Sequence, residues 1–390
     1  LVWVLLLTAE PALAACPFCP PSSPPLAEQL AESDLAGLVK WVKTIPASES
    51  QPEPQTEFVV LEALRLLDKR PKVDEVIRVP YLLEAEPGDL FVMMGKQTEG
   101  ITDWSLPIPV TEISYQYIKQ APSMERPAAD RLKYFLKFLE FSDRTIANDA
   151  FAEFGRAQYA DVVAIRDHLS RATVRKWMAN LQPDEQMRLG FYGMLLGLCG
   201  NDDDAQFLEQ EVSRTTPPTG TRLGLDGMMG GYVILTGEMG LKRLIEWKLQ
   251  TPDQPDGDVY ALVNTLRFLW QFAPERAPRA QIEAAMESLL DRPTFAEVAV
   301  VDLARWQCWQ VTERVLAMYG KPPFDDPSAK RTIIQFALTC EKKLDDPQSE
   351  TKHPAAAAAR KFLADLKQTD PETLKLAKSF FGNRSPETAQ

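Results

Sequence analysis

Apolar residues recur at helical spacing along most of the chain, over residues 127–381. The first apolar stripe lies in residues 131–140 and consists of Leu132, Phe135, Leu136 and Leu139. Asp143 then stands where an N-cap is expected for a second helix, which carries an apolar stripe of its own. Because neither helix can bury its stripe alone, the pattern predicts that the two helices pack as a pair.

The same two-helix pattern repeats toward the C-terminal end. Further pairs are predicted to begin near Asp184, Arg222, Asp258, Thr294 and Ser328. The later starts are about 35 residues apart, which is the period of helical-repeat arrays. An additional pair, residues 159–169 and 173–181, precedes them. We therefore predict an α-solenoid of HEAT-like helix pairs over residues 123–383, followed by a flexible tail over residues 384–390. The surface of such a solenoid commonly binds a partner.

Two motifs in this helical part have the residue types of ligand sites. Gly224, Gly227 and Gly231 form a glycine-rich stretch, but no Lys-Ser/Thr follows them as in a phosphate-binding loop. Their helical spacing predicts a close approach of two helices instead. The acidic run at residues 202–204 could bind a cation, but its position after Gly200 favours helix capping.

The apolar spacing changes from helical to strand-like nearer the N-terminal end. Three short runs, rich in β-forming residues and bounded by Pro and Gly, are residues 58–67, 73–81 and 90–94. Trp104 and residues 107–109 are expected at an edge. A helix is the alternative for residues 58–67, because strict alternation is missing there.

A short amphipathic helix is predicted before these runs, over residues 26–42. Residues 26–122 are therefore expected to form a small β-rich domain, an OB-like barrel or a sandwich. The fold class that follows is α+β with two domains and mainly α content. Chain length supports two domains, since 390 residues exceed the size of one ordinary domain.

The charge balance is acidic, with a formal net charge of −12 spread along the chain. Phosphate attraction needs a basic surface, so this charge argues against a dedicated binder of nucleic acids or of anionic membranes. The chain has two histidines, His168 and His353, which do not stand in a metal-binding spacing, and a Ser-His-Asp triad would have to use one of them. We therefore predict no catalytic residue, no metal site and no cofactor.

Residues 1–15 have the pattern of a secretory signal peptide. An apolar run at residues 2–7 is followed by small residues and Ala12-Leu13-Ala14, as at a cleavage site. A buried N-terminal strand is the alternative. The sequence Leu13-Ala14-Ala15-Cys16 also resembles the lipobox of bacterial lipoproteins, which implies a lipid anchor at Cys16. We expect an exported protein, periplasmic or extracellular, with no transmembrane span in the mature chain.

Residues 16–25 are predicted to be a Pro-rich linker that begins with Cys16-Pro17-Phe18-Cys19. This motif resembles the active site of glutaredoxins, in which the first cysteine lies at a helix N-terminus that lowers its pKa. Four prolines in the next six residues make a helix start here unfavourable. A structural disulfide between Cys16 and Cys19, or lipidation of Cys16, is therefore expected, given an oxidising compartment.

An N-terminal cysteine motif, a β-rich segment and the sequence Gly88-Asp89-Leu90-Phe91-Val92 together resemble netrin-like or tissue-inhibitor-of-metalloproteinase domains, which are OB-type barrels. The order of parts is similar to exported bacterial proteins that join such a domain to HEAT-like helices. That family has C-x-C and several barrel disulfides, whereas Cys16 and Cys19 are the only cysteines before Cys199. Inhibition of metalloproteinases is therefore not expected here.

Residues 302–310 concentrate four candidate partner-binding residues: Asp302, Arg305, Trp306 and Trp309. Tryptophan and arginine are enriched in interface hot spots. Core packing, with Asp302 and Arg305 in ion pairs, is the alternative. The predicted function is an exported binding or scaffold protein for an envelope protein. The alternatives are a thiol-disulfide oxidoreductase that uses Cys16 and Cys19, or an envelope hydrolase.

Overall fold

The computed structural model describes residues 16–19, 23–49, 51–66, 72–99, 101–217, 220, 222–251, 253–344 and 353–383. The predicted signal peptide and C-terminal tail lie outside these residues. The chain divides between Leu169 and Ser170 into two compact units, and each is described by itself below. The helices nearest the sheet in sequence therefore belong to its compact unit, and the domain boundary expected at residues 122 and 123 stays a prediction.

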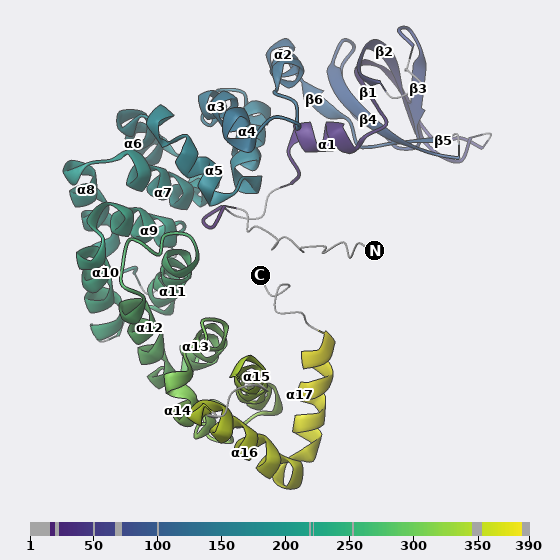
Figure 1. The fold of residues 1–390 in the computed structure, drawn as a ribbon. Helices are drawn as coiled ribbons and strands as arrows, with labels where there is room; N and C mark the ends of the chain where they lie inside the picture. The colour runs from purple at the N-terminus through teal and green to yellow at the C-terminus, as the bar shows by residue number, and fades with distance from the viewer. Residues whose placement is uncertain are drawn as a thin grey trace, which may run out of the picture. The chain divides into compact units, whose positions relative to one another are not determined.

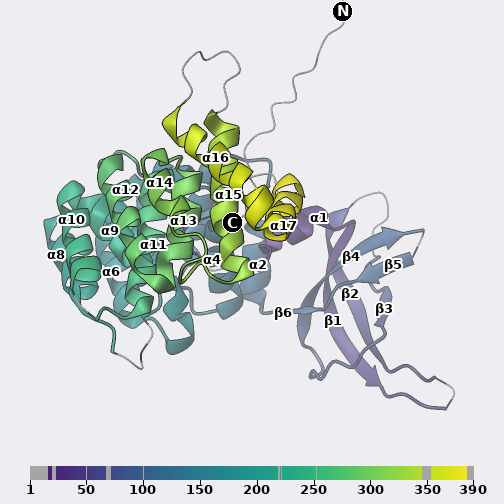
Figure 2. The same cartoon turned by 90° about the horizontal axis from the view of Figure 1, so that it is seen from below.

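The first unit contains an antiparallel, barrel-like sheet (Figure 1; Figure 2 shows its strands from a second side). Its strands are β1 (Leu35–Ile45), β2 (Gln55–Leu66), β3 (Val76–Val79), β4 (Leu90–Thr98), β5 (Ile101–Trp104) and β6 (Ile108–Val110). The strand order is β3-β2-β1-β4-β5, and β6 also pairs with β4. The predicted strands are confirmed, and Trp104 lies on an edge strand.

Alternate residues of these strands share one apolar core. Val39 of β1 pairs with Val60 of β2 and with Phe91 of β4, and all three side chains are buried. Phe58 meets Phe91 edge-on, with ring centroids 5.6 Å apart. Because residues two apart face the same side of a strand, this core fixes the pairing register.

The helix predicted over residues 26–42 is wrong beyond Glu32. Helix α1 (Leu26–Glu32) ends where the N–H of Ser33 bonds back to the carbonyls of Gln29 and Leu30, and β1 begins at Leu35. Pairing of β1 with strands on both sides outweighs the local helical spacing of its leucines. The helical alternative for residues 58–66 is wrong for the same reason, because β2 pairs with β1 and β3.

Helices follow the sheet within the first unit. They are α2 (Glu112–Gln120), α3 (Ala128–Phe135), α4 (Arg144–Arg156) and α5 (Tyr159–Ala164), with 3₁₀ turns η1 (Leu136–Phe138) and η2 (Arg166–His168). The predicted cap is confirmed, since the Asp143 carboxylate accepts from the N–H of Thr145 at 2.9 Å. Leu132, Phe135 and Leu139 are buried, as their stripe predicts.

The second unit is a succession of helix pairs. Its helices are α6 (Arg171–Asn180), α7 (Leu189–Cys199), α8 (Asp202–Ser213), α9 (Leu225–Thr236), α10 (Glu238–Ile245), α11 (Asp256–Gln271), α12 (Arg279–Ser288), α13 (Pro293–Arg305), α14 (Thr312–Leu316), α15 (Pro327–Leu344), α16 (Pro354–Thr369) and α17 (Pro371–Asn383). Short turns are η3 (Pro183–Arg188), η4 (Glu246–Gln250), η5 (Leu289–Asp291) and η6 (Trp309–Val311). The mainly α, two-part architecture is confirmed. Consecutive helices pack directly in α7 with α8, α9 with α10, α11 with α12, and α15 with α16, whereas the predicted pair 159–169 and 173–181 is divided between the two units.

Within this unit the pairs stack in two rows along a curve. Helices α7, α9, α11, α13 and α15 form the inner row, and α8, α10, α12, α14 and α16 form the outer row (Figure 1). Neighbours in the inner row contact directly, as α7 with α9, α9 with α11, and α13 with α15. A repeat array is built in this way, with each pair packed against the next.

The glycines of α7 and α9 allow those helices to touch backbone to backbone. A Cβ atom on Gly227 would lie 2.1 Å from the carbonyl oxygen of Gly190, and one on Gly231 would lie 2.0 Å from that of Gly193. The predicted close approach is confirmed. The capping role of the acidic run is confirmed too, since Asn201 and Asp204 form a capping box at the start of α8.

Candidate functional site

Polar side chains form a continuous ladder across three helices of the inner row. Asn264 of α11 donates to the carboxylate of Asp226 of α9 at 3.3 Å. Arg267, one turn further along α11, donates to the side-chain amide oxygen of Asn264 at 3.3 Å and to the Asp302 carboxylate of α13 at 2.7 Å. Arg305 completes the ladder with a bond of 3.3 Å to the other oxygen of Asp302. We call Asp226, Asn264, Arg267, Asp302 and Arg305 the inner-row ladder.

The side chains of the ladder differ in exposure: Asp302 is buried, and the two arginines are partly exposed. The side chain of Asp302 is 0% exposed, whereas those of Arg267 and Arg305 are 32% and 47% exposed. Burial raises the pKa of Asp302, and the guanidinium of Arg267 acts against this rise. Burial also raises the pKa of Asp226. Both arginines are therefore held by the buried Asp302, while part of each arginine side chain stays accessible.

Apolar side chains accompany the ladder on the same helices. Tyr260 precedes Asn264 by one turn of α11 and is 48% exposed, and Val301 beside Asp302 is 40% exposed. Thr332 of α15 donates to Glu297 of α13 at 2.7 Å, which extends the polar contacts to the next helix of the row. The face therefore mixes exposed tyrosine, arginine and aliphatic surface.

The four predicted partner-binding residues separate into two groups. Asp302 and Arg305 belong to the ladder. Trp306 is only 7% exposed and stacks on Trp270 with centroids 4.7 Å apart, and Trp309 is 8% exposed and meets Phe336 edge-on at 5.5 Å. The tryptophans therefore pack neighbouring helices together.

The pattern of residues 302–310 could not reveal Asp226, Asn264 and Arg267, because these three lie on other helices. The spacing of residues along the sequence does connect them. Asp226, Asn264 and Asp302 follow one another at intervals of 38 residues, and Arg267 and Arg305 are also 38 residues apart. Equivalent positions of successive repeats lie side by side in an array, so this interval places the five side chains together.

The N-terminal segment of the first unit contacts α4. Cys16 and Cys19 are joined by a disulfide, and the N–H of Cys16 donates to the Gly155 carbonyl at 3.2 Å. The N–H of Leu26 donates to the buried carboxylate of Asp149 at 2.6 Å. In the described segment no helix begins at the cysteines, because α1 begins at Leu26. The glutaredoxin arrangement is therefore missing, while the lipid anchor stays a prediction.

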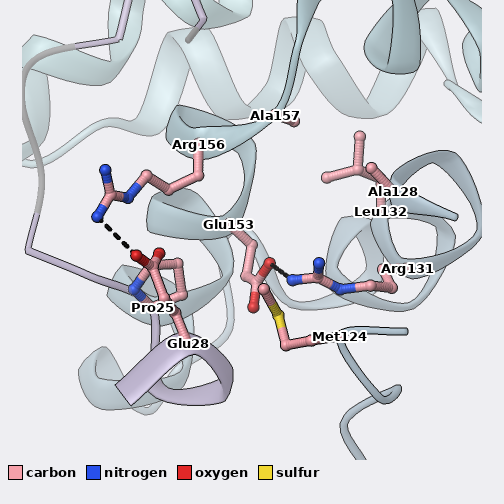
Figure 3. A pocket seen from close by; sticks show the side chains of 9 residues that line it. All are labelled: Pro25, Glu28, Met124, Ala128, Arg131, Leu132, Glu153, Arg156 and Ala157. Atoms are coloured by element: carbon pink, nitrogen blue, oxygen red, sulfur yellow. Dashed lines mark hydrogen bonds and ion pairs between the residues drawn. The ribbon is translucent and has the colours of Figure 1, made fainter. Parts of the chain in front are cut away.

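A cavity of about 310 Å³ lies beside this segment (Figure 3). Glu153 of α4 and Arg131 of α3 point toward one another in it and form a buried ion pair, and Arg156 binds Glu28 at 2.9 Å. Burial raises the pKa of Glu153 to about 7 against the opposing charge of Arg131, and the charge of Asp149 adds to the rise.

A carboxyl group that titrates near neutrality has the protonation behaviour of a general acid or base. A catalytic site also needs a nucleophile or a second polar group at the reacting atom. The nine lining residues include no Ser, Thr, Cys, Lys or His. The charges of this cavity instead bind one another and tie Glu28 of α1 to α4.

The cysteines of the second unit are not in environments that favour reactivity. Cys308 and Cys340 are buried, and Cys199 is partly exposed. Burial raises the pKa of Cys199 to about 11 and that of Cys308 to about 12, which disfavours the reactive thiolate. In the described part of the chain, no group of three His, Cys, Asp or Glu residues could hold a metal ion, and no helix is long and apolar enough to cross a membrane.

Comparison with protein-family models, with curated proteins and with solved structures gives no match to this chain. The arrangement of its own residues therefore carries the functional argument.

Proposed function

We propose that this chain is an exported binding protein, and that the inner row of its helical array binds a protein partner in the cell envelope. The observation that carries the proposal is the inner-row ladder. Its two arginines both bind the buried carboxylate of Asp302, and Arg267 also bonds to Asn264, which in turn bonds to Asp226 of α9. The exposed Tyr260 and Val301 lie on the same helices, α11 and α13.

Two physical arguments support a binding role for this face. Tyrosine and arginine supply much of the binding energy at protein interfaces. Side chains that are already held in place lose less conformational entropy on binding, which favours affinity. Arg267 makes two ladder bonds before any partner arrives, so its orientation costs little on association.

Site-specific photocrosslinking in cells tests the proposed face. A benzophenone amino acid at position 260 should give a discrete crosslinked species, whereas the same residue at Met239 of the outer row should not. Met239 is a matched control because it is also exposed, at 62%. Arg305→Ala should weaken the crosslink from position 260, and Lys242→Ala, which removes a cation from outer-row helix α10, should not. Equal crosslinking from both rows would contradict the proposal.

Export is part of the proposal and rests on the pattern of residues 1–15. A reporter fused to these residues behind a restored start should cross the inner membrane. Retention of the reporter in the cytoplasm would contradict an envelope partner. A thioether-linked lipid and a disulfide at Cys16 exclude one another, so the intact mass of the mature protein distinguishes them.

Two finer assignments also belong to the proposal. We propose that the barrel-like sheet is of OB type with netrin-like order of parts, and that the helix pairs are HEAT-like. The sequence layout supports the first and the two-row stacking of α7 to α16 supports the second. Neither assignment brings metalloproteinase inhibition with it, because the C-x-C motif is missing.

A further inference from the structure

A basic hollow lies in the first unit, apart from both charge clusters described above. It has a volume of about 620 Å³ and is lined by residues between Gln120 and His168. Its charged and aromatic lining residues are Arg126, Asp130, Lys133, Tyr134, Lys137 and His168. Three permanent cations and one acid therefore face this space, in a chain whose net charge is −12.

Asp130, the only acid that lines the hollow, already forms an ion pair. Asp130 binds Lys133 at 2.9 Å, one turn along α3. Arg126 and Lys137 have no acid within ion-pair distance among the residues that the structure describes. Lys133 and Lys137 are one helical turn apart, a spacing at which like charges repel. The lining of the hollow therefore carries more positive than negative charge, and Arg126 and Lys137 are the cations without an ion pair in the described residues.

The backbone that carries these cations is well fixed. The N–H of Arg126 donates to the carbonyl of Ser123 at 3.0 Å, so a closed turn places Arg126 before α3. The hydroxyl of Tyr134 donates to the Tyr117 carbonyl at 2.9 Å, and the two rings stack at 5.7 Å. The N–H of His168 bonds to the Ile165 carbonyl at 2.8 Å. The three cations therefore line the hollow from one stretch, residues 126–137, and His168 lines it from a second segment, with the backbone of both held by these bonds.

We propose that this hollow binds a phosphate group, with Arg126 and Lys137 as the charge-bearing contacts and His168 as a further donor. Guanidinium and ammonium groups make charge-assisted hydrogen bonds to phosphate oxygens, and arginine can bind two of them at once. A doubly charged phosphate also removes the repulsion between Lys133 and Lys137. The group can belong to a soluble phosphorylated compound or to a phospholipid headgroup, since the chemistry of recognition is the same.

Titration of the full chain with inorganic pyrophosphate at low ionic strength tests the proposal. We expect saturable binding that weakens with added salt. Arg126→Ala and Lys137→Ala should each weaken it about tenfold or more, as expected for loss of a hydrogen bond to a charged group. Arg166→Ala is the control, because Arg166 is an exposed cation of turn η2 and, unlike His168 of the same turn, does not line the hollow. Circular dichroism should show that all three variants remain folded.

A second arm distinguishes the two sources of phosphate. Vesicles that contain phosphatidylglycerol are compared with vesicles of phosphatidylcholine alone, again with the two variants and the control. Retention by the anionic vesicles that depends on Arg126 and Lys137, without pyrophosphate binding, assigns a lipid headgroup. Pyrophosphate binding without vesicle retention assigns a soluble ligand. Absence of both, or a response to pyrophosphate that chloride reproduces at equal ionic strength, overturns the proposal.

Discussion

The negative charge of a buried carboxyl group must be balanced by a nearby cation or removed by a proton, and buried acids of this chain show both cases. Asp204 is fully buried and binds Arg171 at 2.8 Å and Arg175 at 3.1 Å. Glu153 has one cation, Arg131, but lies close to the second buried acid Asp149. Burial, to which the charge of Asp149 adds, therefore raises the pKa of Glu153, which retains its proton above the ordinary range of a glutamate.

This difference predicts a pH dependence of stability. The pKa of Glu153 is about 7 in the folded chain against an ordinary value of 4.5, so the folded state binds more protons between these limits. Its stabilising contribution is complete below pH 4.5 and is lost as the pH rises through about 7, with a slope of at most about 1.4 kcal/mol per pH unit. Glu153→Gln should remove this component from the free energy of unfolding, measured by chemical denaturation across that range.

The exposed Glu125→Gln is the control for this experiment and should keep the slope of the parent. Asp149 contributes in the same direction, since burial raises its pKa as well. The difference between the parent and Glu153→Gln therefore measures the contribution of Glu153 together with its coupling to Asp149. A variant with the slope of the parent would show that Glu153 titrates normally.

At the scale of elements, periodicity identified the helices of the array because each buries a stripe on its own partner. It failed for residues 35–42, where Leu35, Leu38 and Val39 fit a helix as well as a strand. The choice there is made by pairing with β2 and β4, which lie far along the chain. Non-local pairing is not visible in a local pattern, so the sheet could be predicted only in outline.

The same limit applied to the candidate site. Asp302 and Arg305 stand together in the sequence and could be found locally. Their partner Arg267 lies one repeat earlier, and only the 38-residue interval connects it to them. The burial of Trp306 and Trp309 likewise depends on Trp270 and Phe336, which belong to other helices.

The contact between α7 and α9 gives a prediction at this scale. Gly227→Ala should lower the free energy of unfolding by about 1–3 kcal/mol or more, because the added methyl group meets the Gly190 carbonyl and the helices must separate. Gly257→Ala is the matched control in the first turn of α11, where a Cβ meets nothing within 4 Å. It should be neutral or stabilising by about 0.4–1 kcal/mol, through the unfolded state. Equal stability of the two variants in urea denaturation would rule out the close helix contact.

At the scale of the whole molecule, two compact units with different architectures respond differently to damage. The barrel-like sheet has one apolar core to which its strands contribute jointly, including Val39, Phe58 and Met93. The helix pairs of the second unit instead bury their stripes between neighbours. In an array of this kind stability is carried by nearest-neighbour interfaces, so local damage spreads to adjoining pairs and fades with distance.

Trp309→Ala tests this locality. Loss of a side chain that is 8% exposed and packs against Phe336 should cost about 3–5 kcal/mol through lost burial and the cavity that remains. Hydrogen exchange should therefore rise most over residues 294–336 and change little over residues 58–94. Phe58→Ala is the reciprocal variant, because it opens the core of the sheet and should raise exchange over residues 35–110 but not over residues 294–336. If either substitution loosened both regions equally, the chain would unfold as one cooperative body, and the partner-binding face could not be altered independently of the sheet.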